Sequence, residues 1–230
     1  MKNYALIGDI HSIHSRLSQA LTYCQEHDLT PIFLGDIFDS RCSISDSVSV
    51  YNLIRDAEKT LGAIVLQSNH QDKLIRYLKG HKIALSNGLD ITVNEFKNSD
   101  VDFSDLLEWL VCKPYGVVFK DKNDVEYRCA HAYFSSRIEI SDYEDVYFVH
   151  SDVLNKKLKS VMIYGPVNNG CRIHWWETPK KYDYVMVSGH YHKLIIEDHC
   201  LVLDGECGNE GDHVFLALYD VNKKLLKKFF

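Results

Sequence analysis

Five short polar segments of the sequence place carboxylate, imidazole or carboxamide side chains directly after an apolar run. They are Gly8-Asp9-Ile10-His11, Gly35-Asp36-Ile37-Phe38-Asp39, Ser68-Asn69-His70, Ala130-His131-Ala132 and Gly189-His190-Tyr191-His192. Oxygen and imidazole ligands without a thiolate suit manganese, iron, nickel or zinc. Two such metals about 3.5–4 Å apart clamp the attacking and leaving oxygens of an in-line displacement. A single Gly-Asp or Gly-His is usually only a turn, so the prediction of a hydrolytic metal site depends on the whole series.

The apolar runs before these segments must hold them in place. Runs at residues 4–8, 31–34 and 63–66 predict strands, and residues 15–27, 45–60 and 71–79 show the spacing of helices. Strands that alternate with helices are typical of a parallel sheet buried on both faces. In such sheets ligands bind beyond the carboxyl ends of the strands, which is where the first three polar segments lie.

The rest of the chain shows fewer helices. Residues 103–112 predict a short amphipathic helix, and residues 117–119 and 125–130 predict a hairpin around Asp121-Lys122-Asn123-Asp124. Residues 133–160 show no clear period. Further strands are predicted at residues 161–164, 184–187, 200–203 and 214–219, in an antiparallel or mixed arrangement. No internal repeat or flexible linker is visible.

The composition excludes several classes of protein. The 230 residues carry 26 Lys and Arg against 32 Asp and Glu, a net charge of −6, which argues against a broad nucleic-acid-binding surface. No apolar stretch approaches the roughly 20 residues of a membrane helix, and the first residues do not fit a signal peptide. The seven cysteines include no CxxC pair, which favours a reduced protein. We therefore expect a cytoplasmic protein with no membrane partner, and its oligomeric state stays open.

Taken in order, the five segments resemble the GD-x-H, GD-x-x-D, GNH, H and GH-x-H blocks of the calcineurin-like metallophosphoesterases, over nearly the whole chain. A narrower resemblance is to the bacterial-type branch of the phosphoprotein-phosphatase (PPP) family. That branch includes symmetrical and PrpE-like bis(5′-nucleosyl)-tetraphosphatases and the phosphatase module of bacterial polynucleotide kinase-phosphatase. The narrower resemblance is carried by residues 69–74 and 76–78, Gly88-Leu89, Thr92-Val93, Tyr164-Gly165, residues 172–175, Leu203-Asp204-Gly205 and Cys207.

The resemblance implies a metallo-dependent phosphatase fold, which is an α/β fold built as a four-layer αββα sandwich with mixed sheets. Residues 1–230 would form a single domain. The first half would supply one sheet and most metal ligands, and the C-terminal strands would supply the second sheet. Residues 80–125 would form a cap-like insertion over the cleft.

The resemblance also assigns roles to individual residues. Asp9, His11 and His192 would hold the first metal, Asp36 would bridge both metals, and Asn69, His131 and His190 would complete the second. The cofactor would be two divalent metal ions, with manganese expected first and iron, zinc or nickel as alternatives. A water or hydroxide bridging them would be the nucleophile. His70 would donate a proton to the leaving group, and Asp39 would orient it.

The sequence departs from the family pattern in several places. The family usually has Arg directly after the second Asp of its second block, where this chain has Ser40 and then Arg41. Arg41 is the first candidate for a phosphate clamp, and Arg172 is the second, with an exposed surface arginine as the alternative reading. Ser68 replaces the usual Gly of GNH, and Gln71 replaces the usual acid after it. Trp175-Trp176 fits a nucleobase stack or, more simply, an aromatic anchor in the core.

The predicted reaction is metal-dependent hydrolysis of a phosphate ester or anhydride. The substrate would be nucleotide-type, a dinucleoside polyphosphate or a polynucleotide phosphate. One alternative is a serine/threonine phosphoprotein phosphatase. Another, from a different class, is a non-catalytic metal-binding scaffold, which loss of ligands would mark; here the ligand positions of the family are filled.

Overall fold

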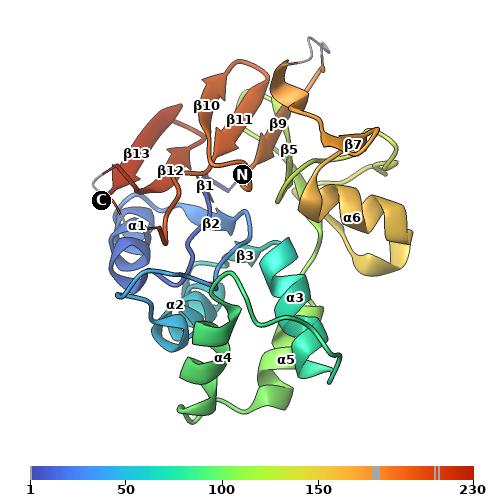
Figure 1. Cartoon of the computed structure of the whole chain (residues 1–230). Coiled ribbons are helices and arrows are strands. Elements are labelled where there is room, and N and C mark those ends of the chain that lie inside the picture. Colours follow the sequence, from blue (N-terminus) through green and yellow to red (C-terminus); the bar gives the residue numbers. More distant parts are fainter. Residues whose placement is uncertain (1, 178–181, 210, 212) are drawn as a thin grey trace.

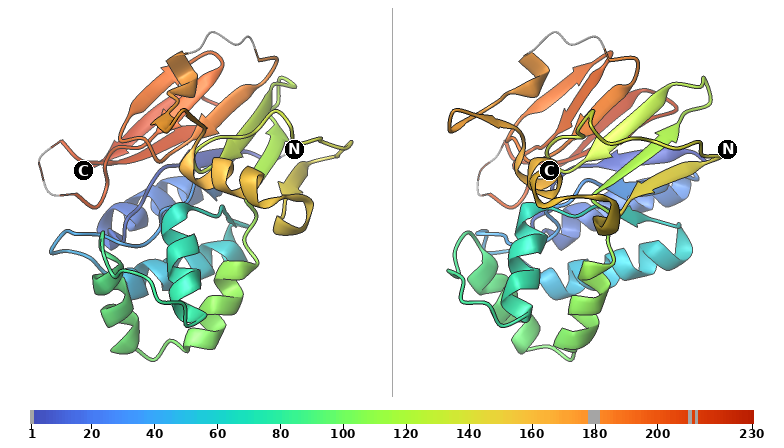
Figure 2. Two further views of the ribbon diagram at one scale, coloured as in Figure 1. Left: turned by 45° about the vertical axis from the view of Figure 1, so that its right-hand side comes forward. Right: turned by 90° about the vertical axis from the view of Figure 1, so that its right-hand side faces the viewer.

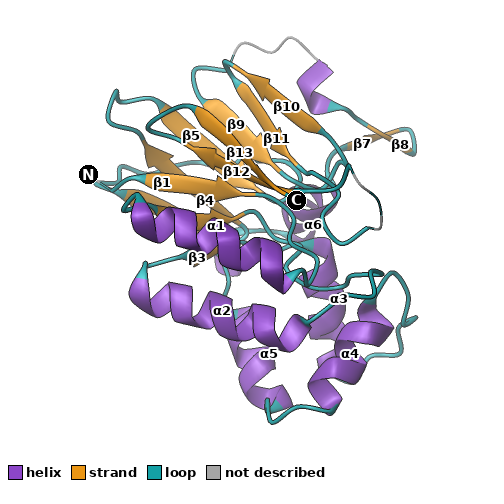
Figure 3. Ribbon diagram, turned by 90° about the vertical axis from the view of Figure 1, so that its left-hand side faces the viewer, coloured by secondary structure: helices purple, strands orange, loops and turns teal. Residues whose placement is uncertain are grey.

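The computed structural model describes residues 2–177, 182–209, 211 and 213–230, and two β-sheets pack face to face at its centre. Helices lie against the outer face of the first sheet (Figures 1 and 3). They are α1 (His14–Glu26), α2 (Ser47–Thr60), α3 (Asn69–Leu78), α4 (Leu89–Lys97) and α5 (Phe103–Val111). Figure 2 shows these helices on one side of the molecule and the second sheet on the other.

The first sheet has the strand order β13-β12-β1-β2-β3. Its strands are β1 (Tyr4–Ile7), β2 (Thr30–Phe33), β3 (Ile64–Val65), β12 (Leu216–Asp220) and β13 (Leu225–Phe229). Strands β1, β2 and β3 run parallel, as the alternation of strands and helices predicts. Strand β12 pairs antiparallel with β1, so the prediction that the C-terminal strands all belong to the second sheet is wrong. All residues of β12 are buried. Leu216 and Leu218 pack in the core with the helices, and Ala217 and Tyr219 pack between the two sheets.

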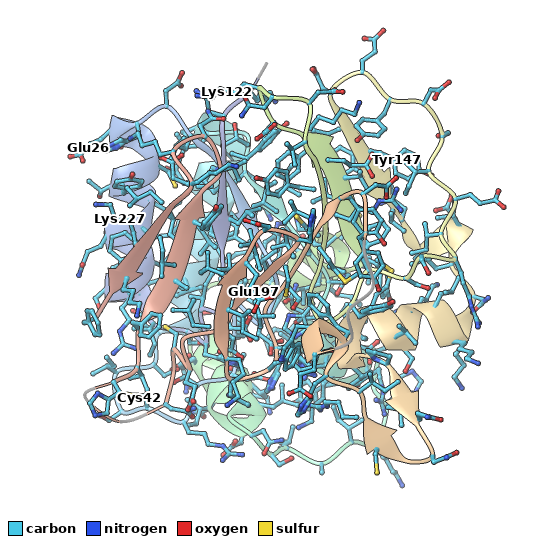
Figure 4. All side chains as sticks on the ribbon, turned by 90° about the horizontal axis from the view of Figure 1, so that it is seen from above. Glu26, Cys42, Lys122, Tyr147, Glu197 and Lys227 are labelled. Carbon is cyan, nitrogen blue, oxygen red and sulfur yellow. The ribbon has the colours of Figure 1, made fainter. Side chains whose placement is uncertain are left out.

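The second sheet is also mixed, with the strand order β10-β11-β9-β5-β4-β6. Its strands are β4 (Gly116–Lys120), β5 (Glu126–Ala130), β6 (Val146–Val149), β9 (Val185–Ser188), β10 (Leu194–Glu197) and β11 (Cys200–Leu203). The predicted hairpin of β4 and β5 joins this sheet, and β5 runs parallel to β9. Lys227 of β13 and Tyr147 of β6, on edge strands of the two sheets, lie at opposite sides of the molecule (Figure 4).

The cores follow from the alternation of side chains along each strand. On β1, Ala5 and Ile7 pack against the helices, whereas Tyr4 and Leu6 pack between the two sheets. Helix α6 (Lys156–Tyr164) and the 3₁₀ turn η2 (Trp175–Glu177) contribute to two smaller cores on the other face of the second sheet. The four-layer αββα arrangement with mixed sheets is therefore confirmed.

The predicted strand at residues 161–164 is wrong, because these residues form the last turn of α6. Asn155 starts this helix, and its Oδ1 accepts a hydrogen bond of 3.0 Å from the backbone N–H of Leu158. Met162 and Ile163 are buried by one face of the helix. A four-residue apolar run is too short for its periodicity to distinguish a helix turn from a strand. Helix α4 and strands β6, β10 and β13 were not predicted.

The segment of residues 80–125 contributes to both halves of the fold. Helices α4 and α5 pack with α2 and α3 in the core beside the first sheet, and β4 belongs to the second sheet. Its cap-like role and the single domain stay predictions. All seven cysteines, each within the described residues, are free thiols. None of the helices in the described part of the chain has the length and apolar character needed to cross a membrane.

Candidate active site

The five polar segments meet at one edge of the two sheets, around a pocket of about 410 Å³. Two segments follow β1 and β2, one begins α3, and two follow β5 and β9 of the second sheet. The residues that line the pocket are Asp9, His11, Asp36, Asp39, Arg41, Asn69, His70, Asn87, Arg172, His190, His192, Glu206, Gly208 and Asn209. The buried His131 lies directly behind this lining, at 3.3 Å from Asp36. The structure therefore brings every residue of the predicted site to one region.

The backbone of this region is held in an uncommon conformation. Five predicted site residues have positive φ, namely His11 (47°), Asp36 (43°), Asp39 (69°), His190 (71°) and His192 (52°). Residues other than glycine rarely adopt the left-handed region, at a cost of about 1–3 kcal/mol each, and such residues tend to cluster at active sites and ligand clamps. Gly189 is needed for close packing, because a Cβ there would lie 1.9 Å from Oδ1 of Asp9. Strain concentrated in this way supports a functional role for the region.

The two departures around Asn69 belong to one local structure. Ser68 is the N-cap of α3, and its Oγ accepts from the backbone N–H of Gln71 at 3.3 Å and lies 2.6 Å from Oε1 of Gln71. The Gln71 amide donates to the carbonyl of Leu66 at 2.9 Å. Ser at the N-cap with Gln three residues later is the spacing of a capping box. A neutral pair therefore holds the loop that presents Asn69 and His70.

Four acceptor atoms converge at the position assigned to the second metal. Nε2 of His131 lies 2.8 Å from Oδ1 of Asn69, 3.1 Å from Nδ1 of His190 and 3.3 Å from Oδ2 of Asp36. Nδ1 of His131 donates to the carbonyl of Leu34 at 2.9 Å, so in the neutral ring Nε2 carries a lone pair. Lone pairs of nitrogen and oxygen repel one another unless a cation or a proton lies between them. This donor set fits a divalent metal.

The position assigned to the first metal is more open. Nδ1 of His11 lies 3.0 Å from the carbonyl oxygen of Phe38 and donates there, which leaves Nε2 with a lone pair 3.8 Å from Oδ2 of Asp36. Asp9 accepts from the backbone N–H of His190 at 3.0 Å. His192 lies in the pocket lining, but its side chain is 63% exposed and does not enter the close cluster.

Negative charge accumulates beside this position. Burial raises the pKa of Asp9 well above its ordinary value, and the carboxylates of Asp204 and Asp36 raise it further. Burial also opposes ionisation of Asp36, but the neighbouring His131, His70 and His11 hold the pKa of that carboxyl well below its ordinary value. Nε2 of His190 is buried without a hydrogen-bond partner among the described residues. Crowded carboxylates at this position fit the binding of a cation.

His70 and Asp39 form the predicted pair. Nδ1 of His70 lies 2.8 Å from Oδ2 of Asp39, and Nε2 lies 3.9 Å from Oδ2 of Asp36. Burial lowers the pKa of His70, but the carboxylates of Asp36 and Asp39 outweigh it and raise the pKa to about 9. The raised pKa favours the protonated imidazole at neutral pH, and the buried carboxylate of Asp39 holds the ring at the pocket.

Both candidate arginines line the pocket. Arg41 is exposed and donates from Nη2 to Oδ1 of Asn87, and the guanidinium carbon of Arg172 lies 5.8 Å from the ring centre of Tyr191. Of the two tryptophans, Trp175 is a core anchor, because it is 4% exposed and its Nε1 donates to the carbonyl of Ala132 at 3.1 Å.

Asp204 is a site residue to which the sequence analysis gave no role. It is buried, and its two carboxylate oxygens accept from the backbone N–H groups of His192 at 2.7 Å and Glu206 at 2.9 Å. The signal was present, because Asp204 directly follows the apolar strand Cys200–Leu203. Asn87, Glu206 and Asn209 also line the pocket without such a signal.

The chain is similar to known proteins in part of its sequence and in its fold. No family model matches the chain. It is 29% identical over 103 residues to the asymmetrical bis(5′-nucleosyl)-tetraphosphatase PrpE of Oceanobacillus iheyensis, and 31% identical over 108 residues to that of Anoxybacillus flavithermus. These matches cover 40% and 42% of this chain and the same shares of the relatives, so the chain spans about two fifths of the curated relatives it matches.

Among solved structures, a candidate diadenosine tetraphosphatase has a TM-score of 0.62 at 17% identity, over 99% of this chain and 92% of that one. The cold-active protein-tyrosine phosphatase of a psychrophilic Shewanella species has a TM-score of 0.58 at 15% identity, over 100% of this chain and 81% of that one. Likeness at these identities shows the fold, and it extends over the whole of this chain.

Proposed function

We propose that this chain is a calcineurin-like metallophosphoesterase and acts as a dinuclear metal-dependent hydrolase of phosphate esters or anhydrides with nucleotide-type substrates. The observation that carries the proposal is the convergence of Asn69 Oδ1, His190 Nδ1 and Asp36 Oδ2 on Nε2 of His131. It lies in the same pocket as the His70–Asp39 pair. A cation site next to an imidazole that can donate a proton suits phosphate hydrolysis, because cations stabilise the attacking and leaving oxygens and a general acid protonates the leaving oxygen.

The chain would hold two divalent cations at this pocket. Asn69, His131 and His190 would hold one, and Asp9, His11 and His192 the other, with Asp36 between them. Bound there, the cations, with manganese expected first, would supply acidification of water and neutralisation of phosphate charge. The distances within the His131 cluster favour this position as the more preformed of the two.

The remaining residues would handle the proton and the phosphate. When the bond between phosphorus and the leaving oxygen breaks, the proton on Nε2 of His70 would pass to that oxygen. Asp39 fixes the tautomer by accepting from Nδ1 at 2.8 Å. Arg41 and Arg172, from separate segments of the pocket lining, would hold phosphate oxygens through their planar guanidinium groups.

The nucleotide preference is supported by the names of the PrpE relatives, which act on a bis(5′-nucleosyl) tetraphosphate. The test is a panel of diadenosine tetraphosphate, 2′,3′-cyclic nucleotide, 3′- and 5′-phosphorylated RNA and a phosphoserine peptide, assayed with manganese. We expect the highest kcat/KM on a nucleotide-type substrate. A preference for the phosphopeptide would instead identify a phosphoprotein phosphatase.

The panel is run beside Asp36→Asn and the control Asp198→Asn. Asp198 is exposed and lies outside the pocket lining. We expect Asp36→Asn to bind less metal and to lose more activity than the about 10–100-fold that loss of a ligand's hydrogen-bond partner costs. Wild-type protein that binds manganese but hydrolyses no substrate of the panel would indicate a metal-binding scaffold and overturn the proposal.

A further inference from the structure

The side chain at position 40 cannot act as the phosphate clamp. Ser40 is 1% exposed, and its Oγ donates to the carbonyl of Gly208 at 3.0 Å and accepts from the backbone N–H of Cys42 at 3.0 Å. These bonds turn position 40 away from the pocket and fix the turn that follows Asp39. Arg41, the next residue, lies in the pocket lining instead.

The side-chain contact of Arg41 is with Asn87, whose Oδ1 accepts from Nη2. Within the described residues, the ion pairs of the structure include none between Arg41 and a carboxylate. A carboxamide acceptor orients a guanidinium without neutralising it, whereas a carboxylate partner would compete with a phosphate for the same donors.

Asn87 is itself held in place by its neighbours. Gly88 packs on the turn that carries Arg41, since a Cβ on Gly88 would lie 2.6 Å from the carbonyl carbon of Asp39 and 2.7 Å from the carbonyl oxygen of Ser40. On the other side of Asn87, Nζ of Lys73 donates to the carbonyl of Ser86 at 2.7 Å. Asn87 has a φ of 60°, a conformation that Asn adopts more readily than most residues. Gly88 therefore anchors one end of the loop against the turn that carries Arg41.

We propose that Asn87 is a positioning residue that holds the guanidinium of Arg41 in the pocket, still charged, for the phosphate of the substrate. The inference rests on the proposed function. It explains how an arginine one place later than in the family pattern can still serve the pocket, because the loop of residues 86–88 supplies the acceptor that orients it. The loop comes from a different segment, 46 residues along the chain from Arg41.

The test uses Asn87→Gly and Asn87→Asp, because both residues tolerate positive φ. Asn87→Gly removes the acceptor, and we expect KM to rise about two- to fivefold with kcat little changed, the range expected for ordering an exposed charged side chain. Asn87→Asp should raise KM further, because its carboxylate pairs with Arg41. Ser86→Ala is the loop control. It removes the 3.1 Å contact from Nζ of Lys73 to Ser86 Oγ, keeps the 2.7 Å contact to the Ser86 carbonyl and the Asn87 side chain, and should leave KM unchanged.

A double-mutant cycle separates positioning from a general loosening of the loop. In the Arg41→Ala background, Asn87→Gly should have no further effect on KM, since the group that it orients is gone. An equal rise of KM in both backgrounds would overturn the proposal, and so would a wild-type KM in both Asn87 variants.

Calorimetric titration of manganese-loaded protein with inorganic phosphate gives a readout that needs no turnover. We expect weaker phosphate binding by Asn87→Gly and unchanged binding by Ser86→Ala. Equal phosphate binding by wild type and Asn87→Gly would overturn the role of Asn87 and leave the proposed function standing. Wild-type protein that neither binds phosphate nor hydrolyses any substrate would overturn both.

Discussion

Nδ1 of His70 and Oδ2 of Asp39 lie 2.8 Å apart, at the point where the start of α3 meets the loop after β2. The carboxylate is buried, with its side chain 1% exposed, whereas the imidazole is 16% exposed. Asp39 is therefore the buried member of the pair, and the imidazole ring of His70 is the member that reaches the pocket. This arrangement charges the imidazole and sets its direction, which distinguishes His70 from the histidines of the cation cluster.

His70→Ala should retain bound metal and fold normally, yet lose activity in a way that depends on the leaving group. General-acid catalysis contributes typically about 10²–10⁴-fold and matters most when the leaving oxygen carries developing charge. We expect a loss in this range on phosphoserine and a smaller loss on a nitrophenyl phosphate, whose leaving group is stable as an anion. The measurement is kcat on both substrates with metal content checked in parallel.

Two results would contradict this role for His70. Equal losses on both substrates with metal retained would remove the proton donor from the mechanism. Loss of metal in His70→Ala would identify His70 as a ligand, which the proximity of its ring to His11 and Asp36 makes worth checking.

Asp39→Asn should change the pH dependence on alkyl phosphates. Against its burial, the carboxylates of Asp36 and Asp39 raise the pKa of His70 to about 9, so the proton donor is present at neutral pH and is lost as pH rises through that value. Removing the Asp39 carboxylate lowers this pKa, so the alkaline fall in kcat should move to lower pH. A pH profile of kcat for both proteins checks this, and coincident alkaline limbs would show that Asp39 does not set the charge of His70.

The sequence predicts correctly those elements whose apolar pattern matches the side of the element that the fold buries. The units β1–α1, β2–α2 and β3–α3 were predicted because apolar runs alternate with helical spacing, and the parallel pairing follows from that order. The site residues of these units gather for the same reason, since the carboxyl ends of parallel strands meet at one edge.

Other features depend on contacts that a sequence pattern does not contain. Residues 161–164 have the composition of a strand, but the Asn155 cap upstream makes them the end of a helix. Strand β12 pairs with β1 in the first sheet, where all five of its residues are buried, and a sequence pattern does not show which sheet will bury an apolar strand. The contact of Asn87 with Arg41 depends on the packing of Gly88 on Asp39 and Ser40. Asp204 did carry a local signal, a carboxylate after an apolar strand, but it lacks the histidine that four of the five segments contain.

Asp204→Asn should weaken metal binding without removing a predicted ligand. Asp204 holds the backbone of His192 and Glu206, and its negative charge lies beside Asp9. Loss of a group that orients ligands typically costs about 10–100-fold in metal affinity or activity. A manganese titration of activity and of bound metal should therefore shift to higher concentration. An unchanged titration would limit Asp204 to a structural role in its loop.

Gly88→Ala and Gly80→Ala form a matched pair that tests whether the loop at Asn87 supports the site. Both glycines have positive φ, 87° and 79°, so alanine at either position should cost about 1–2 kcal/mol of unfolding free energy in backbone strain. A Cβ on Gly80 meets nothing within 4 Å, whereas a Cβ on Gly88 would overlap the backbone of Asp39 and Ser40. Gly88→Ala should therefore lower the unfolding free energy by a further amount of about 1–3 kcal/mol, as overpacking does.

Gly88→Ala should also lower kcat on alkyl phosphates, because Asp39 must shift relative to His70, whereas Gly80→Ala should keep wild-type kcat. Urea unfolding and steady-state kinetics of both variants make the comparison, and equal stability and equal kcat in the two variants would mean that the loop carrying Asn87 does not constrain the His70–Asp39 pair.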